Sequence, residues 1–414
     1  SGEGSYTELP RWNGTQPLGT NLTYSTDMFG SLALQAVKHH DPSVPLFLYL
    51  PWQAVHTPYD LPPTCTVKTC PRHIPAMMTD CDRWTGELVK ALKSKGMYEN
   101  TLIVYSADNG GVEDGSNYPL RGEKKTNWQG GIRVTAFVSG GFVPASLRGT
   151  TNDETFHIVD WYPTFARLAG VDGTDDAPTP PLPIDPLNPD KDIYQGNLSW
   201  PSVDGIDIWD HLTGASTSRV HPYLWLTAEV LVKDGRYKLV VAQPYHRSKF
   251  NDIVYNRVRN PSSDGWKQPN GTWVNSLDSE WPCNKKRDRT HFQPCLFDLY
   301  EDPSEKNNLA KDMPSLVAEL WNELNRTALT QFLSRSPEAL LGNCDNQCAE
   351  KHWGGLFGPI CGVPGCNGSD TQNSRPMPIM AAQLGTQEPG RLRLRSEAAV
   401  FTIVVVGPFV IYLV

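Results

Sequence analysis

Thr101-Leu-Ile-Val-Tyr-Ser106 is an apolar run that leads directly into the polar turn Ala107-Asp-Asn-Gly-Gly111. Such a run, followed by a glycine turn, is typical of a strand buried on both faces of a parallel sheet. A second run of this kind, Pro45-Leu-Phe-Leu-Tyr-Leu50, is bounded by prolines. The stretch from Cys81 to Lys95 between them has helical apolar spacing. This strand–helix–strand order predicts an α/β layer architecture.

Further elements flank this unit on both sides. The apolar pattern predicts helices over 26–39 and 156–168 and a strand over 132–138. From about Tyr223 the pattern changes to short strands over 224–230, 235–242 and 295–300, as in an antiparallel sheet, followed by an amphipathic helix over 316–332. We therefore expect a boundary near residue 218. It separates an α/β domain (1–218) from a smaller antiparallel-sheet and helix domain (219–370), which a polar linker (371–397) follows.

The last segment, Ala398 to Val414, is an uncharged and almost wholly apolar run of 17 residues, preceded by Arg391, Arg393 and Arg395. It has the minimum length for a membrane span. Its terminal position and the polar spacer before it also suit a GPI attachment signal. The third interpretation is an ordinary terminal strand or an error of gene prediction. We expect some membrane attachment through this tail, by a span or by a GPI anchor.

Charge and glycosylation patterns bear on partners and compartment. The net charge of -8 argues against nucleic acid as a partner. Asn-x-Ser/Thr acceptor sequences occur at Asn13, Asn21, Asn197, Asn270, Asn325 and Asn367. Together with nine cysteines they predict the secretory pathway, with a lysosomal, extracellular or cell-surface destination.

The cysteines predict local disulfide loops. Cys283 and Cys295 are close in sequence, as are the late residues Cys344, Cys348, Cys361 and Cys366. Their C-x3-C and C-x4-C spacings differ from the usual zinc pattern, so disulfides are favoured over zinc. Because nine is odd, one cysteine is either free or paired outside this chain.

Asp108 and Asn109 follow the strand that ends at Ser106. In open α/β sheets, ligands bind beyond the carboxyl ends of the strands. An adjacent carboxylate and carboxamide supply hard oxygen ligands suited to Ca²⁺ or Mg²⁺. The alternative is an ordinary turn, because Asp-Asn-Gly is common turn chemistry.

Two more segments carry candidate chemistry. His56, in Gln53-Ala-Val-His-Thr-Pro58, follows the strand that ends at Leu50, and it is either a proton donor to a leaving group or a structural histidine. The segment from Pro119 to Arg133 is either a solvated basic loop or a site that neutralises a sulfate or phosphate group, through Arg121, Lys124, Lys125 and Arg133. The shared placement of these segments at one sheet edge predicts an anion-ester site.

These motifs and their order along the chain resemble the sulfatase family. Their residues are most similar to those of the arylsulfatase B group, which includes arylsulfatases I and J. The resemblance runs from about Tyr24 to about residue 362. It rests on Pro45-Leu-Phe-Leu-Tyr-Leu, His56-Thr-Pro, Asp108-Asn-Gly-Gly, Pro119-Leu-Arg-Gly-Glu-Lys, Trp128-Gln-Gly-Gly-Ile-Arg, His157-Ile-Val-Asp-Trp-Tyr-Pro-Thr164, Asp204-Gly-Ile-Asp207 and Leu296-Phe-Asp-Leu-Tyr-Glu-Asp-Pro-Ser-Glu-Lys-Asn-Asn-Leu309. It implies the α/β fold of the alkaline phosphatase superfamily.

The resemblance also implies roles for individual residues. Asp108 and Asn109 would be two ligands of the family's Ca²⁺. Lys124 would contact the sulfate, with Lys125 as the alternative if the loop is shifted by one residue. His56 would contact the sulfate or protonate the leaving alcohol. An Asp-Asn pair, rather than Asp-His, argues against the related two-zinc phosphodiesterases.

The family's nucleophile is missing from this chain. Sulfatases carry Cys-x-Pro/Ala-x-Arg, whose cysteine is oxidised to formylglycine, and none of the nine cysteines begins that motif. Cys70-Pro-Arg is the nearest imitation, with Pro and Arg at the wrong positions. The early Asp-Asp metal pair and the Lys-x-His segment are absent too, so the Ca²⁺ ligand set is incomplete. We expect a chain truncated at its N-terminus.

Two functions follow from the resemblance. The first is sulfate-ester hydrolysis, with a sulfated small molecule or glycosaminoglycan as substrate, by an enzyme of which this chain is an inactive fragment. The second is a catalytically inactive pseudosulfatase or binding protein, secreted or held at the surface. The start at Ser1 without an initiator Met favours the first.

Overall fold

The structure is a computed structural model, and it describes residues 12–13, 16–17, 24–56, 59–112, 115–124, 126–174, 203–227, 230–241, 266–270, 272–274, 294–328 and 402–407. Contacts divide the chain into two compact units. One comprises Ser1–Thr23, Ala169–Val203 and Ser334–Ala399, and within it β1 (Trp12–Asn13) pairs antiparallel with β2 (Gln16–Pro17). The other comprises Tyr24–Leu168, Asp204–Leu333 and Val400–Val414, and it holds the predicted site residues. The expected linker 371–397 lies outside the described residues.

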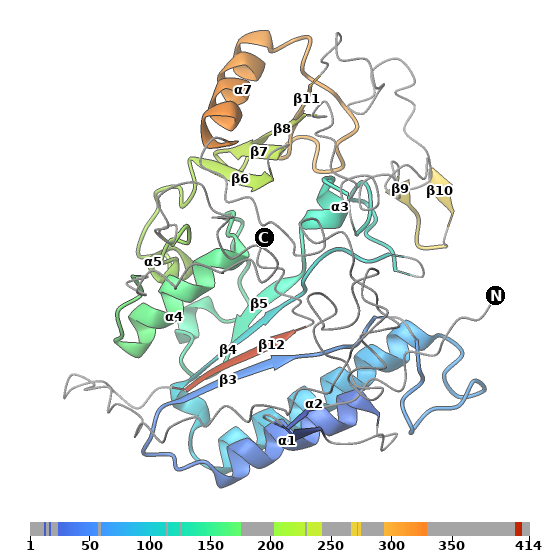
Figure 1. Cartoon of the computed structure of the whole chain (residues 1–414), viewed down its shortest axis with the longest axis vertical. Helices are drawn as coiled ribbons and strands as arrows, with labels where there is room; N and C mark the ends of the chain where they lie inside the picture. The colour runs from blue at the N-terminus through green and yellow to red at the C-terminus, as the bar shows by residue number, and fades with distance from the viewer. Residues whose placement is uncertain are drawn as a thin grey trace, which may run out of the picture. The chain divides into compact units, whose positions relative to one another are not determined.

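The larger unit is built on a four-stranded sheet in the order β3-β12-β4-β5 (Figure 1). Its strands are β3 (Leu46–Pro51), β4 (Thr101–Ser106), β5 (Ala136–Ser139) and β12 (Thr402–Gly407). β12 is parallel to both β3 and β4, and β5 is antiparallel to β4. The carboxyl ends of β3 and β4 therefore meet at the same edge, as the sequence predicts.

The strand between β3 and β4 comes from the apolar tail. Val406 lies level with Leu50 on one side and Tyr105 on the other. In the structure this segment is a strand that pairs on both sides within the sheet. Of the three interpretations of this tail, the structure therefore matches the terminal strand. Among the described residues, no helix is both long and apolar enough to span a membrane.

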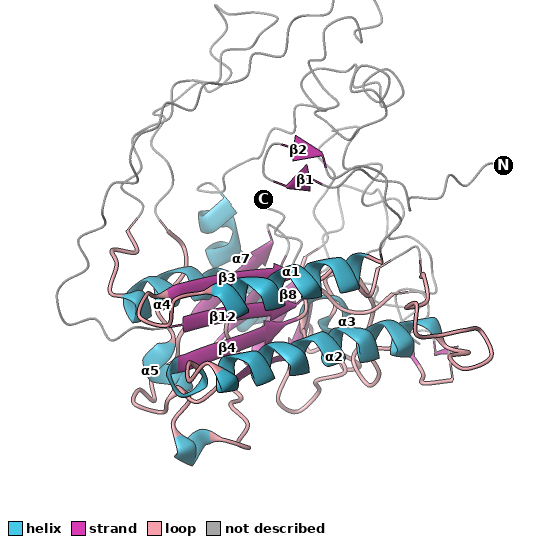
Figure 2. Ribbon diagram, turned by 90° about the horizontal axis from the view of Figure 1, so that it is seen from below, coloured by secondary structure: helices cyan, strands magenta, loops and turns pink. Residues whose placement is uncertain are grey.

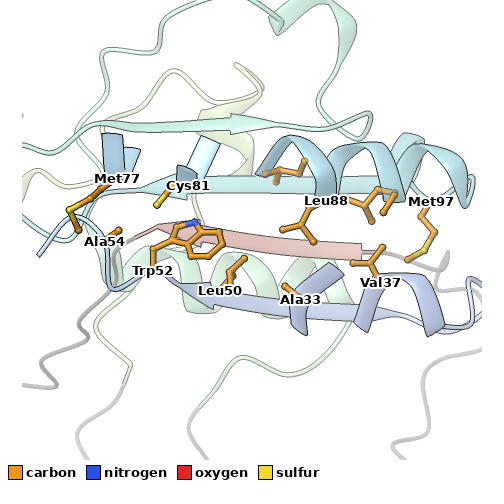
Figure 3. Close-up of a cluster of buried hydrophobic side chains, with 12 residues drawn as sticks. Ala33, Val37, Leu50, Trp52, Ala54, Met77, Cys81, Leu88 and Met97 are labelled. Atoms are coloured by element: carbon orange, nitrogen blue, oxygen red, sulfur yellow. The ribbon is translucent and has the colours of Figure 1, made fainter. Parts of the chain in front are cut away.

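Helices cover both faces of this sheet (Figure 2). On one face, α1 (Ser25–His39) and α2 (His73–Ser94) pack on Leu50 and Ile103 (Figure 3). On the other face, α4 (Trp161–Ala169) and α5 (Trp209–Leu212) supply Trp161, Phe165 and Trp209, which pack on Leu102 and Val104. Successive residues of β4 thus enter opposite cores, as the pleat of a strand requires.

Among the predicted elements whose bounds differ in the structure, two matter most for the site. α2 begins at His73 rather than Cys81, because Ala76 and Met77 continue its buried stripe and Pro75 sits in the first turn, where proline is tolerated. The strand expected over 132–138 is instead the short helix α3 (Gln129–Ile132) followed by β5.

β3 is not buried on both faces, which corrects the prediction. Phe47 is 59% exposed and Tyr49 is 36% exposed, whereas β4 is buried almost throughout. β3 lies at the edge of the sheet, and the core formed by α4 and α5 is centred on β4.

The second sheet is antiparallel, as predicted, in the order β11-β8-β7-β6. Its strands are β6 (Tyr223–Thr227), β7 (Val230–Lys233), β8 (Tyr237–Val240) and β11 (Cys295–Asp298). The amphipathic helix α7 (Pro314–Ala328) buries Leu320 and Leu324 against Leu231, Leu239 and Leu296. The predicted boundary near residue 218 falls between α5 and β6, and the residues on both sides belong to the same compact unit. A small hairpin of β9 (Trp266–Lys267) and β10 (Trp273–Val274) completes the described strands of this region.

The described cysteines are partly oxidised. Cys65 and Cys70 form a disulfide, and Cys295 is also disulfide-bonded. Cys81 is a free thiol in the core on α2, and burial raises its pKa to about 12, so it is protonated and unreactive at neutral pH. Cys283 and the four late cysteines lie outside the described residues, so their pairing stays a prediction.

Candidate functional site

The turn after β4 holds the first two candidate residues. Asp108 is exposed and Asn109 half-buried, immediately beyond the strand that ends at Ser106. The backbone N–H of Ala107 donates to the carbonyl of Thr135 (3.0 Å), and that of Gly110 donates to the carbonyl of Gly131 (3.0 Å). Because both bonds run to the segment on either side of Arg133, the turn is fixed along its length.

A glycine is required at the centre of this contact. A Cβ atom at Gly110 would lie 1.7 Å from the carbonyl oxygen of Gly130, which is backbone and cannot swing away. Gly130 is equally enclosed, since a Cβ there would lie 2.5 Å from the carbonyl oxygens of Arg121 and Gly122. The glycines of the two motifs therefore let two backbone segments pack directly on each other.

Lys124 lies in the loop that this packing brings to the turn. Its backbone N–H donates to the carbonyl of Gly111 (3.3 Å), and its side chain is half-buried. The ammonium of Lys124 acts on Asp108: partial desolvation raises the pKa of Asp108, and the positive charge of Lys124 opposes that shift. Asp108, Asn109 and Lys124 thus form one loop cluster. Lys125, the alternative sulfate contact, lies outside the described residues.

Asn117 joins the two loops, and nothing in the sequence pattern singled it out. Its side-chain oxygen accepts from the N–H of Gly111 (2.8 Å), and its amide donates to the carbonyls of Gly111 (2.9 Å) and Gly122 (3.2 Å). An asparagine can satisfy an N–H and two carbonyls at once because it carries both an acceptor and two donors. The signal in the sequence was a single polar residue in a loop, which is too common to identify it.

His56 lies at the same sheet edge but on a different strand. It follows β3 and is exposed, and its backbone N–H donates to the carbonyl of Gln53 (3.2 Å). β12 separates β3 from β4, so the ends of these two strands lie about 10 Å apart. The structure therefore places His56 across β12 from the Asp108 turn. Thr57 and Pro58 of its motif lie outside the described residues.

Arg121 does not contribute to an anion site at the surface, which corrects one prediction. Its side chain is buried, its Nη1 donates to the carbonyl of Glu305 (3.1 Å), and its guanidinium lies 3.7 Å from the ring centre of Trp128. Of the four cations in the predicted basic segment, Arg121 has this structural role and Lys124 lies beside Asp108.

The oxygen donors present do not make a complete calcium site. Within the described ranges, no group of three or more His, Cys, Asp or Glu side chains could hold a metal ion. Ca²⁺ takes about 6–8 oxygen ligands, and Asp108 with Asn109 supplies two side chains. These residues therefore fit part of a calcium shell, and a complete shell needs further oxygen donors.

Asp160 links three segments that follow the site residues in the sequence. Its carboxylate accepts from the backbone N–H groups of His157 (2.7 Å) and Ile206 (3.0 Å) and contacts Nε2 of His221 (2.9 Å). Asp160 is fully buried, and it joins the start of α4 to the segment before α5 and to the segment before β6. Two motifs of the sequence, around His157 and around Asp204, thus share one structural role.

Comparisons with known proteins agree with this arrangement. The sequence model of the family described as Sulfatase matches residues 5–171. The chain is 30% identical over 354 residues to arylsulfatase J of Mus musculus, covering 82% of this chain and 54% of that protein. It is 25% identical over 296 residues to steryl-sulfatase of Rattus norvegicus, covering 69% of this chain and 44% of that protein. The chain spans about half the length of these curated relatives.

Solved structures share the fold. The crystal structure of Ps i-CgsB superposes with a TM-score of 0.50 at 22% identity, covering 77% of this chain and 57% of that one. At this level of identity the likeness concerns the fold. The order of the motifs, their placement at one edge of the sheet and the sequence matches agree: residues 5–171 match the sulfatase family, and the chain is similar to two sulfatases over most of its length.

Proposed function

We propose that this chain carries part of the active site of a sulfuric ester hydrolase. Lys124 contacts the sulfuryl oxygens, and His56 contacts the sulfate or protonates the leaving alcohol. Asp108 and Asn109 supply two oxygen ligands of a Ca²⁺ ion. The observation that carries the proposal is the backbone contact of the two glycine loops, through Gly110 and Gly131, which holds Lys124 beside Asp108.

The chemistry of these residues suits a sulfate ester. Charge develops on the sulfuryl oxygens and on the leaving oxygen as the ester bond breaks, and a fixed ammonium group stabilises such charge. A proton delivered to the leaving alcohol lowers the barrier further, and an imidazole is well suited to this at neutral pH. Bound Ca²⁺ would add Lewis-acid stabilisation once its remaining ligands are supplied.

The proposed substrate is a sulfate ester of a small molecule or of a glycosaminoglycan. The relatives' names, arylsulfatase J and steryl-sulfatase, describe aryl and steryl sulfates as the class acted on by those proteins. The net charge of -8 gives no general attraction for a polyanionic chain, so recognition would rest on local cations such as Lys124.

We place the protein in the secretory pathway, where disulfides persist. The Cys65–Cys70 disulfide supports this, and Asn270 and Asn325, two of the acceptor asparagines, are exposed. Thr402–Gly407 of the apolar tail lies within the sheet, between β3 and β4.

A second candidate is a sulfate-ester-binding protein without turnover. It is favoured by one observation, that no cysteine of the 414 residues begins Cys-x-Pro/Ala-x-Arg. Both candidates use the same anion site, and they differ in whether the gene product supplies a nucleophile.

The test is hydrolysis of 4-methylumbelliferyl sulfate by the product of the full-length transcript, including any sequence upstream of Ser1. We expect turnover, with kcat/KM reduced roughly 100-fold or more by Lys124→Ala, as for loss of one charge-stabilising donor. Lys90→Ala, on the exposed face of α2, is the matched control and leaves the rate unchanged. Binding of the ester without hydrolysis by the full-length product would reject the enzyme and favour the second candidate.

A further inference from the structure

Lys238 and Glu305 form a fully buried ion pair. Lys238 is on β8 and Glu305 is in the loop after β11, and each side chain is 0% exposed. The Lys238 ammonium donates to Oε1 of Glu305 at 2.6 Å. Glu305 adopts a left-handed backbone conformation (φ 54°), which is uncommon for a residue with a side chain. The position of this carboxylate is therefore specified by backbone as well as by charge.

Lys238 and Glu305 make further hydrogen bonds to the loop that contains Lys124. The Lys238 ammonium also donates to the carbonyl of Asn127 (2.6 Å). The backbone N–H of Gln129 donates to Oε2 of Glu305 (2.6 Å), and Arg121 donates to the Glu305 carbonyl (3.1 Å). Each of these three bonds joins the second sheet or its loops to residues 121–129.

An aromatic side chain fills the space between these charges. Trp128 is buried, with the Arg121 guanidinium 3.7 Å from its ring centre and the Lys238 ammonium 5.9 Å away. Its ring also meets Phe297 of β11 edge-on at 5.7 Å. Arg121, Trp128, Lys238 and Glu305 together form a buried ion-pair cluster.

This cluster is an expensive way to stabilise a fold. Removing an ammonium and a carboxylate from water costs more than packing apolar side chains of similar volume, and it is offset only when every hydrogen bond is made. Burial lowers the pKa of Lys238 and raises that of Glu305, and each partner opposes the shift of the other. Such a pair fixes the positions of the groups that are hydrogen-bonded to it.

The buried ion-pair cluster holds the loop that contains Lys124. The N–H of Gly130 donates to the carbonyl of Arg121 (2.6 Å), which closes residues 121–130 into a loop, and Lys124 lies within it. The cluster holds this loop from the second sheet, while Gly110 and Gly111 hold it from the turn that carries Asp108. Lys124 is thus fixed from two sides.

We propose that Lys238 and Glu305 are positioning residues for sulfate recognition, and that they hold the 121–130 loop so that Lys124 faces the Asp108 turn. This inference rests on the proposed role of Lys124. The two residues act through the backbone of Asn127 and Gln129 and do not touch the substrate. The second sheet thereby takes part in building the anion site.

The test compares variants of the full chain by hydrogen exchange and by titration with inorganic sulfate. Glu305→Gln is expected to weaken sulfate affinity by about tenfold or more, the loss of one charge-assisted bond, and to speed amide exchange over residues 121–131 while β4 exchanges as before. Lys233→Met is the matched control, because Lys233 pairs with Glu319 at the surface of the same sheet. It leaves both readouts unchanged.

A double variant separates positioning from stability. In Lys238→Met/Glu305→Met the buried charges are replaced by apolar side chains of similar volume, so the fold is retained. The bonds to Asn127 and Gln129 are lost, so faster loop exchange and weaker sulfate binding are still expected. Wild-type affinity and wild-type loop exchange in this variant would overturn the inference.

Lys124→Ala distinguishes the anion site from its positioning residues. If it abolishes sulfate binding while the cluster variants bind as the wild type does, the proposed site stands and the positioning role is rejected. If Lys124→Ala binds sulfate normally, the role of Lys124 is rejected and the inference with it. Loss of binding in both, with faster exchange only in the cluster variants, is the expected result.

Discussion

Gly110 marks the closest approach of the two loops that build the site. Its N–H bonds to Gly131, and its Cα faces the carbonyl of Gly130 at a distance that leaves no room for a methyl group. The glycines of the two motifs therefore carry a packing requirement, and the charged residues beside them depend on it. The sequence predicts the turn, but it does not predict that Gly110 packs against the backbone of Gly130 and Gly131.

Gly110→Ala is expected to lower the free energy of unfolding by about 2 kcal/mol or more, because backbone must move to admit the Cβ. Gly86→Ala is the matched control: a Cβ at Gly86, within α2, meets nothing within 4 Å. That change should stabilise by roughly 0.5–1 kcal/mol through helix propensity. Urea unfolding of both variants measures the difference, and equal effects would contradict the close contact.

His157 gives the fold a dependence on pH. Burial lowers its pKa and His221 acts in the same direction, whereas Asp160 and Asp204 oppose the shift. Its Nδ1 accepts from the N–H of Val159 (3.3 Å), and protonation would remove that acceptor. The unfolded chain therefore binds the proton more readily than the folded chain does.

Because the folded pKa of His157 lies below the unfolded value of about 6.5, its contribution to stability is complete above that pH. The free energy of unfolding should fall as the pH is lowered from about 6.5 toward the folded pKa. His157→Asn keeps a cap acceptor and removes the titration, so its stability curve should be flatter over this window. His39→Gln, on the exposed side of α1, serves as the control, and a pH profile unchanged by His157→Asn would reject this explanation.

At the scale of elements, β12 determines how β3 and β4 relate to each other. It is parallel to both, and without it two strands whose ends carry His56 and Asp108 would face an empty position in the sheet. Unpaired edges of this kind are prone to aggregation. The terminal strand is therefore part of the architecture that positions the site.

Val405→Pro tests this placement, because proline removes a ladder N–H from a strand paired on both sides. A loss of about 2 kcal/mol or more is expected, with a lower thermal midpoint and more aggregate by size-exclusion chromatography. Val405→Thr keeps the N–H and the β-branched shape, so it should cost less. Equal thermal midpoints for the proline variant and the wild type would show that these residues are not in the sheet.

For the whole molecule, the sequence predicts the features that depend on residues close together in the chain. β4, α1 and α7 follow from apolar periodicity, and the end of a parallel strand predicts where Asp108 and Asn109 lie. The buried pair of Lys238 and Glu305 could not be predicted, since each lies more than a hundred residues from the loop it holds and only the packed fold brings them together.

The tail shows the same limit in another form. An uncharged apolar run of 17 residues is compatible with a membrane segment and with a buried strand, because the side chains of both are kept from water. The partners that decide the matter, β3 and β4, lie more than 290 positions earlier in the chain. Buried polar contacts and strand order are properties of the whole molecule.

The most direct test of the sulfate site is the binding of 4-methylumbelliferyl sulfate to this chain, compared with 4-methylumbelliferone, by calorimetry with calcium present. We expect that only the sulfate ester binds, that Lys124→Ala weakens it about tenfold or more, and that Lys90→Ala leaves it unchanged. Equal affinity for the two compounds, or wild-type affinity in Lys124→Ala, would contradict a sulfate site at the Asp108 turn.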